Sequence, residues 1–205
     1  MKFRTTRKGI RASLEPMESA VLAQCAADLL ELLGGPDDQD PLAAPGIRDP
    51  LAELVGMPSG EVTPPQDPAL ARLLPDAYRP PASAESADSA NSAADPRDGL
   101  EQASADFRRY TDADLRAGKR AAASTVLISL HSAGGTMVLD REQADAWLGF
   151  LNDVRLTLGT RLGVTEDTDP DDGDDDDPRT QALQIYSWLG WVQESLLHAL
   201  SSRRR

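Results

Sequence analysis

The sequence predicts a mainly α-helical bundle with a small N-terminal β-hairpin. Aromatic residues make up only 4% of the 205 residues and apolar residues make up 40%. A core must therefore be built mainly from Leu, Ala and Val, which suits helices better than sheets. Apolar residues recur at helical spacing along most of the chain and alternate only near its start. Residues 1–205 are long enough for one domain, and we expect a single helical domain.

The start of the chain has the pattern of a hairpin. Residues 3–6 are predicted as one strand and Lys8-Gly9 as the turn. Ile10, Ala12 and Leu14 then alternate onto one face of a second strand. A lone hairpin is marginally stable in water, so we expect it to pack on helices. Residues 136–139 are a candidate for a third short strand.

A helix is predicted from about Glu15. Pro16 is tolerated in a first helical turn, and Gly34-Gly35 ends the periodic segment. The apolar stripe of this helix comprises Met17, Val21, Cys25, Leu29 and Leu32. A thiol on such a stripe behaves as a small apolar side chain, so we expect Cys25 to be buried and inert.

The next segment is predicted to be mostly connecting chain. Residues 36–65 are punctuated by Pro and Gly, with one short amphipathic helix expected at 49–55. Asp67-Pro68 supplies an N-cap and a first-turn proline for a second short helix, over 69–74. Residues 80–104 contain almost no large apolar residue, so burial would not offset the entropy lost on ordering. We expect a disordered insertion at 80–104.

A longer helix is predicted after this insertion. Thr111 opens a capping sequence, and good helix formers continue to about Ser132. Phe107 and Tyr110 lie just before this helix, and we expect both to pack against it.

Two further long helices complete the bundle. Asp140 can cap the first, which ends at Gly163, and Asp177-Pro178 gives the second a cap and a first-turn proline. The apolar stripe of the first comprises Ala144, Trp147, Leu148, Leu151, Leu158 and Leu162. The stripe of the second comprises Leu183, Tyr186, Leu189, Val192, Leu196 and Leu200.

The charge of the chain is negative overall and unevenly distributed. A net charge of −13 disfavours nonspecific binding to nucleic acid, because phosphates repel acidic surfaces. Residues 1–11 nevertheless carry five basic residues and no acidic one, and residues 203–205 are all Arg. We expect direct nucleic-acid binding to be absent, while the basic N-terminal arm leaves it as an alternative.

The acidic run at 165–177 offers oxygen ligands of the kind that Ca²⁺ and Mg²⁺ prefer. Its spacing does not fit an EF-hand, since placing Gly173 at the glycine position puts Arg179 at the twelfth position. We predict a solvated, mobile loop, with a metal-responsive protein as the alternative. No metal or other cofactor is predicted.

The sequence contains no constellation of residues typical of an enzyme. His131 and His198 are the only histidines and have no zinc-binding spacing, and no Ser or Cys lies in a nucleophile signature. Cys25 is the only cysteine, which excludes an intrachain disulfide and indicates a reducing compartment. No apolar run is long enough to span a bilayer. We therefore predict a non-enzymatic cytoplasmic protein.

The last predicted helix has a wider apolar surface than one core stripe needs. Trp188 and Trp191 join Tyr186 on it. One interpretation is a central helix packed on all sides. The other is an exposed aromatic patch that binds a partner protein or a second copy of the chain, because aromatic residues are enriched at interfaces. The candidate partner-binding residues are therefore Tyr186, Trp188 and Trp191.

Four segments, 67–78, 147–153, 155–164 and 186–190, have a combined pattern that is specific as a family signature. Together they resemble an actinobacterial family of uncharacterised proteins, a domain of unknown function that includes the oxidative-stress-sensing regulator AosR. The resemblance implies a regulatory or adaptor protein in stress-responsive transcription, with a sigma factor or RNA polymerase as the partner. It covers most of the chain outside the predicted insertion.

The resemblance also makes Cys25 a candidate redox residue. A switch made by an intramolecular disulfide needs two cysteines, and the positions one helical turn to either side of Cys25 are Val21 and Leu29. Oxidant sensing by this chain would therefore require sulfenylation of Cys25 or an intermolecular disulfide.

Overall fold

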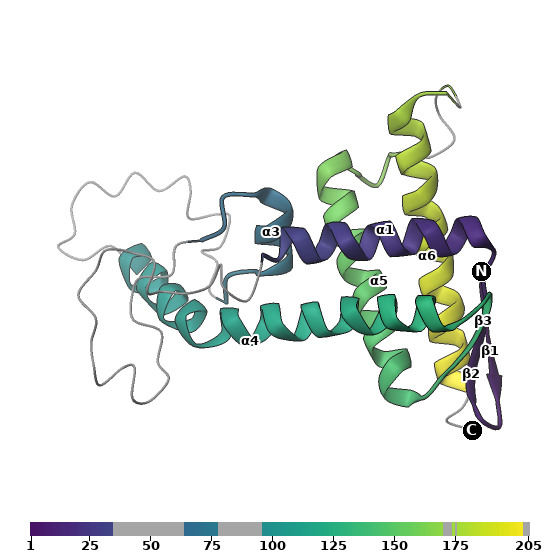
Figure 1. The fold of residues 1–205 in the computed structure, drawn as a ribbon. Helices are drawn as coiled ribbons and strands as arrows, with labels where there is room; N and C mark the ends of the chain where they lie inside the picture. Colours follow the sequence, from purple (N-terminus) through teal and green to yellow (C-terminus); the bar gives the residue numbers. More distant parts are fainter. Residues whose placement is uncertain (35–63, 78–95, 170–173, 175, 203–205) are drawn as a thin grey trace.

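The computed structural model describes residues 1–34, 64–77, 96–169, 174 and 176–202. The chain is mainly helical with a small sheet, so the predicted fold class is confirmed (Figure 1). The predicted helix at 49–55 and the three terminal arginines lie outside the described residues. Among the described residues, no helix is both long and apolar enough to cross a lipid bilayer.

The sheet has three antiparallel strands in the order β1-β2-β3. The predicted hairpin is confirmed, and the candidate third strand is present and pairs with β2. The strands are β1 (Lys2–Thr6), β2 (Gly9–Ser13) and β3 (Thr136–Leu139). Phe3 on β1, Ile10 on β2 and Leu139 on β3 are all buried on one face. Gly9 has a φ of 149°, and a Cβ built there would lie 2.3 Å from the backbone oxygen of Leu139. Only glycine therefore allows β3 to come this close.

Of the five described helices, four form two crossing pairs. The five are α1 (Pro16–Leu32), α3 (Pro68–Leu73), α4 (Pro96–Ser132), α5 (Arg141–Leu162) and α6 (Pro178–Ser202). In Figure 1, α1 and α4 run side by side, and the α5/α6 pair runs across them. The short helix α3 packs against α5, so α5 contacts every other described helix.

Local capping residues fix the start of α3 and both ends of α5. The Asp67 side chain accepts hydrogen bonds from the backbone nitrogens of Ala69 and Leu70, at 2.7 and 3.0 Å, at the start of α3. Asp140 accepts from the backbone nitrogen of Gln143 at 2.8 Å, which begins α5. Gly163 ends α5 in the left-handed conformation with a φ of 62°. All three capping predictions are confirmed.

The predicted start of α4 is wrong. The helix begins at Pro96 and not near Thr111, so residues 96–104 of the predicted insertion are helical, and residues 80–95 lie outside the described residues. The Thr111 hydroxyl donates to the Phe107 carbonyl at 2.8 Å from within the helix and caps nothing. Phe107 is 42% exposed and Tyr110 is 56% exposed, so neither packs as predicted.

The early turns of α4 are held by polar contacts that hydrophobic periodicity does not detect. Ser104 and Arg108 are buried, and the Arg108 guanidinium forms an ion pair with Asp76, which follows α3. About two turns further along α4, Arg116 donates to the Leu33 carbonyl at the end of α1 at 3.3 Å. Polar contacts, and not large apolar side chains, therefore join the first half of α4 to the segment after α3 and to the end of α1.

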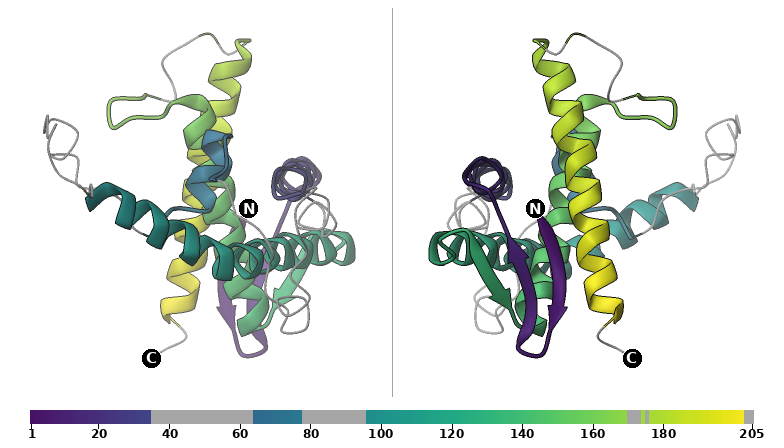
Figure 2. Two further views of the ribbon diagram at one scale, coloured as in Figure 1. Left: turned by 90° about the vertical axis from the view of Figure 1, so that its left-hand side faces the viewer. Right: turned by 90° about the vertical axis from the view of Figure 1, so that its right-hand side faces the viewer.

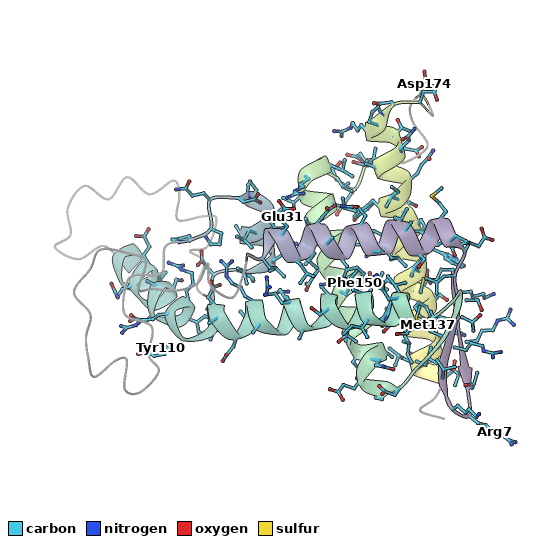
Figure 3. All side chains as sticks on the ribbon, in the orientation of Figure 1. Arg7, Glu31, Tyr110, Met137, Phe150 and Asp174 are labelled. Carbon is cyan, nitrogen blue, oxygen red and sulfur yellow. The ribbon has the colours of Figure 1, made fainter. Side chains whose placement is uncertain are left out.

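The core lies where α5 crosses the sheet. Trp147 and Phe150 are fully buried, with their ring centroids 6.4 Å apart, and Figure 3 shows Phe150 at the crossing of the helices. Phe3 packs edge-on against Trp147 with centroids 6.0 Å apart. Strand β1 lies alongside α6 (Figure 2, right), where the Thr5 hydroxyl donates to the Ala199 carbonyl at 2.7 Å.

Candidate functional site

The three aromatic residues proposed for partner binding lie in different environments on α6. Trp188 is partly buried and packs against the core, and Tyr186 is partly buried against α5. Trp191 is 49% exposed. The two interpretations of this helix therefore apply to different residues. Trp188 belongs to the edge of the core, and Trp191 is available at the surface.

Trp191 is surrounded along α6 by polar side chains. The exposed residues at helical spacing around it are Gln184, Ser187, Glu194 and His198. An exposed Trp on a polar stripe offers a large apolar contact area at low cost in conformational entropy. This surface, which we call the Trp191 face, presents one large aromatic side chain among polar ones.

Tyr186 forms a polar cluster with Arg155 on α5. The Arg155 guanidinium carbon lies 5.1 Å from the Tyr186 ring centroid, a cation–π distance. Its Nη1 donates to Oε1 of Gln193 at 2.8 Å, and its Nη2 donates to the Tyr186 hydroxyl at 3.4 Å. Sequence reasoning identified Tyr186 but missed Arg155 and Gln193.

Two helical glycines make room for this cluster. A Cβ at Gly159 on α5 would lie 3.3 Å from Cε2 of Tyr186. A Cβ at Gly190 on α6 would lie 3.5 Å from Nε of Arg155. A glycine inside a helix costs about 1 kcal/mol relative to alanine, so its presence indicates a close approach by a neighbouring group. These glycines were the available sequence signal for Arg155.

Cys25 lies at the edge of the core and not within it. The buried stripe of α1 comprises Leu22, Ala26 and Leu29 and continues to Leu33 at the C-cap, whereas Met17 is 74% exposed. The predicted stripe was therefore rotated, and Cys25 is half-buried. Burial raises the pKa of the Cys25 thiol to about 11, and the negative charge of Asp28 adds to this shift. At neutral pH the thiol stays protonated, so its reaction with oxidants is slow.

The acidic and histidine residues form no metal site within the described part of the chain. No group of three His, Cys, Asp or Glu side chains gathers there. The middle of the acidic run, residues 170–173 and 175, lies outside the described residues. His131 and His198 are both exposed and lie on different helices, α4 and α6.

The basic N-terminal residues lie on the solvent face of the sheet. Lys2, Arg4 and Arg11 are exposed, and Arg4 and Arg11 lie directly opposite each other on β1 and β2. Arg7 extends from the tip of the hairpin, and Figure 3 places Asp174 far from it at the other end of the molecule. Among the described residues, none of these cations forms an ion pair. The hairpin therefore carries a group of exposed positive charges in a protein of net charge −13.

A groove runs between α4, β3 and the start of α5. Its volume is about 790 Å³, and most of its lining is Ala, Gly, Ser and Thr from α4 together with the four residues of β3. Asp140 and Glu142 are the titratable residues on its lining, and the Asp140 carboxylate already caps α5. The groove therefore presents no arrangement that suits acid–base or nucleophilic chemistry.

Comparisons with known proteins place the chain in a family. The family model described as "Domain of unknown function (DUF2017)" matches residues 1–200. Proteins named "Oxidative stress regulator AosR" from Mycobacterium tuberculosis and Mycobacterium bovis are 33% identical over 201 residues, which is 97% of this chain and 86% of each relative. A relative from Mycobacterium leprae is 32% identical over 197 residues, 93% of this chain and 82% of that protein.

No solved structure matches the chain significantly. The match to the family model nevertheless covers all of the described elements of the fold, from β1 to the last turns of α6. This chain, with its helical bundle and N-terminal sheet, belongs to the DUF2017 family.

Proposed function

We propose that this protein is a non-enzymatic, cytoplasmic regulatory or adaptor protein that acts by binding another protein. The observation that carries the proposal is the Trp191 face, where a half-exposed Trp is surrounded by polar side chains on a helix whose opposite side is buried. The names of the mycobacterial relatives, oxidative stress regulators, support a regulatory role.

The partner we propose is a sigma factor or RNA polymerase. The net charge of −13 would steer the protein toward a basic surface on such a partner and would speed their encounter. The desolvated contact would then come from Trp191, because aromatic anchors contribute most of the binding free energy at interfaces. The family resemblance implies this partner class, whereas the relatives' names support a regulatory role alone.

We propose further that any oxidant response of this chain acts through Cys25 after α1 loosens from the core. The half-buried thiol has a raised pKa, which leaves little thiolate for attack on a peroxide. Separation of α1 from α4 would remove the burial that raises this pKa. The response would then end in a sulfenic acid or an intermolecular disulfide, because Cys25 is the only cysteine.

The test is an affinity purification of the tagged protein from an actinobacterial lysate, with and without oxidant, followed by mass spectrometry. We expect sigma factor or polymerase subunits to be enriched, and Trp191→Ala to lose at least about tenfold of that enrichment. Tyr110→Ala is the matched control, because Tyr110 is another exposed aromatic residue, on α4. If these subunits are absent from the wild-type sample, the proposed partner class is wrong. If Trp191→Ala and Tyr110→Ala lose the same amount of enrichment, the proposal that binding occurs through the Trp191 face is wrong.

The basic sheet face supports a second candidate, direct binding of nucleic acid. Like charges directly opposite on neighbouring strands destabilise a sheet, so the Arg4/Arg11 pair is costly unless an anion covers it. Binding through these residues would weaken steeply with salt. Fluorescence anisotropy with labelled duplex DNA and single-stranded RNA at low salt tests this candidate, and an unchanged anisotropy with both probes would exclude it.

A further inference from the structure

Strand β3 forms an edge of the sheet, and this edge lies along the groove between α4 and α5. The order β1-β2-β3 gives β3 only one neighbouring strand among the described residues. The opposite edge strand, β1, lies against α6, where Thr5 donates to the Ala199 carbonyl. All four residues of β3 line the groove, and Figure 1 shows β3 passing from the end of α4 to the start of α5. An edge of this kind can pair with a further strand.

The register of the sheet shows which backbone groups of β3 point away from β2. Opposite residues in an antiparallel pair of strands alternate between hydrogen-bonded and non-hydrogen-bonded pairs. The backbone nitrogen of Leu14 donates to the Gly135 oxygen at 2.9 Å, which makes these two residues a hydrogen-bonded pair. By alternation, Met137 and Leu139 also form hydrogen-bonded pairs with β2. Val138 lies between them, so its backbone N–H and C=O point toward the outer edge.

Val138 therefore offers one donor and one acceptor at this edge. The contact at Gly9 supports the assignment, because the Leu139 oxygen lies on the β2 side of the strand. The backbone nitrogen of Thr136 already donates to the Ala133 carbonyl at 2.9 Å. Within the described part of the chain, neither outward group of Val138 forms a hydrogen bond. A peptide backbone would satisfy both groups at once.

The wall of the groove opposite β3 consists mainly of small side chains on α4. They include Gly118, Ala121 and Ala122. Two larger apolar side chains on the lining are open to water, since Ile128 is 67% exposed and Val138 is 45% exposed. The groove has a volume of about 790 Å³, which leaves room for large side chains of an incoming segment. Burial of apolar surface would favour their entry.

The described lining of the groove carries negative charge and no positive charge. Its titratable residues are Asp140 and Glu142. The Asp140 carboxylate caps α5, whereas Glu142 is exposed and forms no ion pair with a described residue. The net charge of −13 adds to the negative potential. A segment with a basic residue near Glu142 is therefore favoured over an acidic one.

We propose that this groove binds an extended, basic segment of a partner protein, which adds to β3 as a fourth strand. The backbone of the segment exchanges two hydrogen bonds with Val138. Its side chains alternate, with large apolar ones toward α4 and polar ones toward solvent. A basic residue lies near Glu142. The groove is formed by α4, β3 and α5, so this proposal does not rest on the Trp191 face of α6.

Two other occupants fit the groove less well. A helix satisfies its backbone groups internally, so it would leave the N–H and C=O of Val138 unpaired. A second copy of this chain would bring its own net charge of −13 and its own Glu142 to an acidic groove. An extended basic segment avoids both problems.

The experiment uses the hexapeptide acetyl-Arg-Thr-Leu-Thr-Leu-Thr-amide as the probe. It is titrated into the full-length ¹⁵N-labelled protein, and backbone amide signals are followed by NMR. We expect saturable shifts in β3 and in residues 121–128 of α4. A peptide with Glu in place of Arg should bind at least about threefold more weakly, because an attraction to Glu142 becomes a repulsion. Glu142→Lys should reverse this preference.

Methylated peptides test whether the backbone pairs with β3. Opposite residues of neighbouring strands have their side chains on the same face, and the Val138 side chain faces solvent. The Thr residues of the probe are therefore the ones whose backbone groups face β3. N-methylation of the central Thr should weaken binding at least about tenfold. N-methylation of the Leu that follows it is the matched control and should weaken binding much less.

Protein variants test the same hydrogen bonds from the other side. Val138→Pro removes an N–H that β2 does not use, and proline is tolerated at such a position of an edge strand. We expect binding to weaken at least about tenfold. Val138→Thr keeps the N–H and the branched shape and should bind within about twofold of the wild type. Hydrogen exchange of the β2 amides checks that each variant keeps its sheet.

Several results would overturn the proposal. They are the absence of saturable shifts with the probe, equal binding of the two methylated peptides, and equal binding by Val138→Pro and Val138→Thr. Tighter binding of the Glu peptide would exclude a basic partner segment. If the wild type alone forms a dimer in sedimentation and Val138→Pro does not, a second copy occupies the edge and the proposed partner is wrong.

One further variant separates this groove from the proposed function. Trp191→Ala should bind the probe as the wild type does, because Trp191 lies on α6 and not on the lining of the groove. Loss of probe binding in Trp191→Ala would place the peptide on the Trp191 face and overturn the proposal. Each of the two surfaces can therefore fail its test without the other.

Discussion

Lys119 on α4 donates from its Nζ to Oδ1 of Asp153 on α5 at 2.7 Å, which joins two helices of the bundle by a largely buried ion pair. The Asp153 side chain is only 6% exposed. Removal of one partner from a buried pair leaves an uncompensated charge and costs about 3–5 kcal/mol. We expect Asp153→Ala to lower the free energy of unfolding by about 3 kcal/mol in urea denaturation.

The matched control for this pair is Asp145→Ala, on the same helix. Asp145 pairs with Arg141 at 2.8 Å, but both side chains are about half exposed. A solvent-exposed pair contributes no more than about 1 kcal/mol, so the control should change stability only slightly. If both variants lower the free energy of unfolding equally, the buried Lys119–Asp153 pair contributes no more to stability than an exposed pair.

Gly9 should tolerate no side chain. Its φ of 149° is unfavourable for other residues, and an added Cβ would meet the Leu139 backbone oxygen at 2.3 Å. Gly9→Ala should therefore separate β3 from β2, which faster hydrogen exchange in β3 would reveal. Gly134→Ala is a useful comparison, because Gly134 also has a positive φ of 48° but no neighbouring atom within 4 Å. If hydrogen exchange in β3 is equally fast in both variants, the contact between Gly9 and the Leu139 backbone is not the reason for the faster exchange.

Truncation of the two tryptophans Trp147 and Trp191 should lower stability to very different extents. Trp147 is fully buried between Phe3 and Phe150, and its replacement by Ala should cost about 3–5 kcal/mol. Trp191 is half exposed, so Trp191→Ala should change the free energy of unfolding by less than about 1 kcal/mol. Thermal unfolding followed by circular dichroism measures both effects. A large loss in Trp191→Ala would assign this side chain to the core instead of to an interface.

The Cys25 thiol should be slow to react at neutral pH. With its pKa raised from 9.0 to about 11, alkylation by iodoacetamide should be much slower than for a free thiol at pH 7–8 and should accelerate toward pH 11. Mass spectrometry of quenched samples gives the rate. In 6 M urea, where burial is lost, the rate should rise to that of an ordinary cysteine, and a fast reaction of the folded protein would contradict the raised pKa.

The same pKa shift predicts a change in stability at high pH. The folded state keeps the thiol neutral to a higher pH than the unfolded state, which ionises near pH 9. The stabilisation that depends on the neutral thiol is therefore fully present below pH 9 and is lost as the pH rises toward about 11. Cys25→Ala should flatten this part of the curve of unfolding free energy against pH, whereas Asp28→Asn should lower the pKa only modestly.

Sequence patterns predicted the elements whose stability depends on apolar periodicity and local caps. The hairpin, the third strand and the starts of α3, α5 and α6 each had such a signal, for example Asp140 before α5. The start of α4 had none. The first turns of α4 are stabilised by the Arg108–Asp76 ion pair and by buried Ser104, and contacts with a distant segment leave no local trace in the sequence.

The candidate site was predicted in its residue types but not in its arrangement. Tyr186, Trp188 and Trp191 lie within two helical turns, and spacing alone could not show that they face α5, the core and solvent respectively. Arg155 was missed because a lone Arg in an amphipathic helix is usually a solvated residue. Its position against Gly190 becomes evident only when α5 and α6 are packed together.

The contact between β1 and α6 has a consequence for how the protein is made. The backbone nitrogen of Phe3 donates to Ser195 Oγ at 3.1 Å across 192 positions of the chain. During translation the hairpin leaves the ribosome long before the helix that covers it, and a hairpin without such cover is marginally stable. The sheet can therefore become stable only after α6 has been synthesised. Ribosome stalling before α6 emerges would leave the apolar face of the sheet exposed to chaperones and proteases.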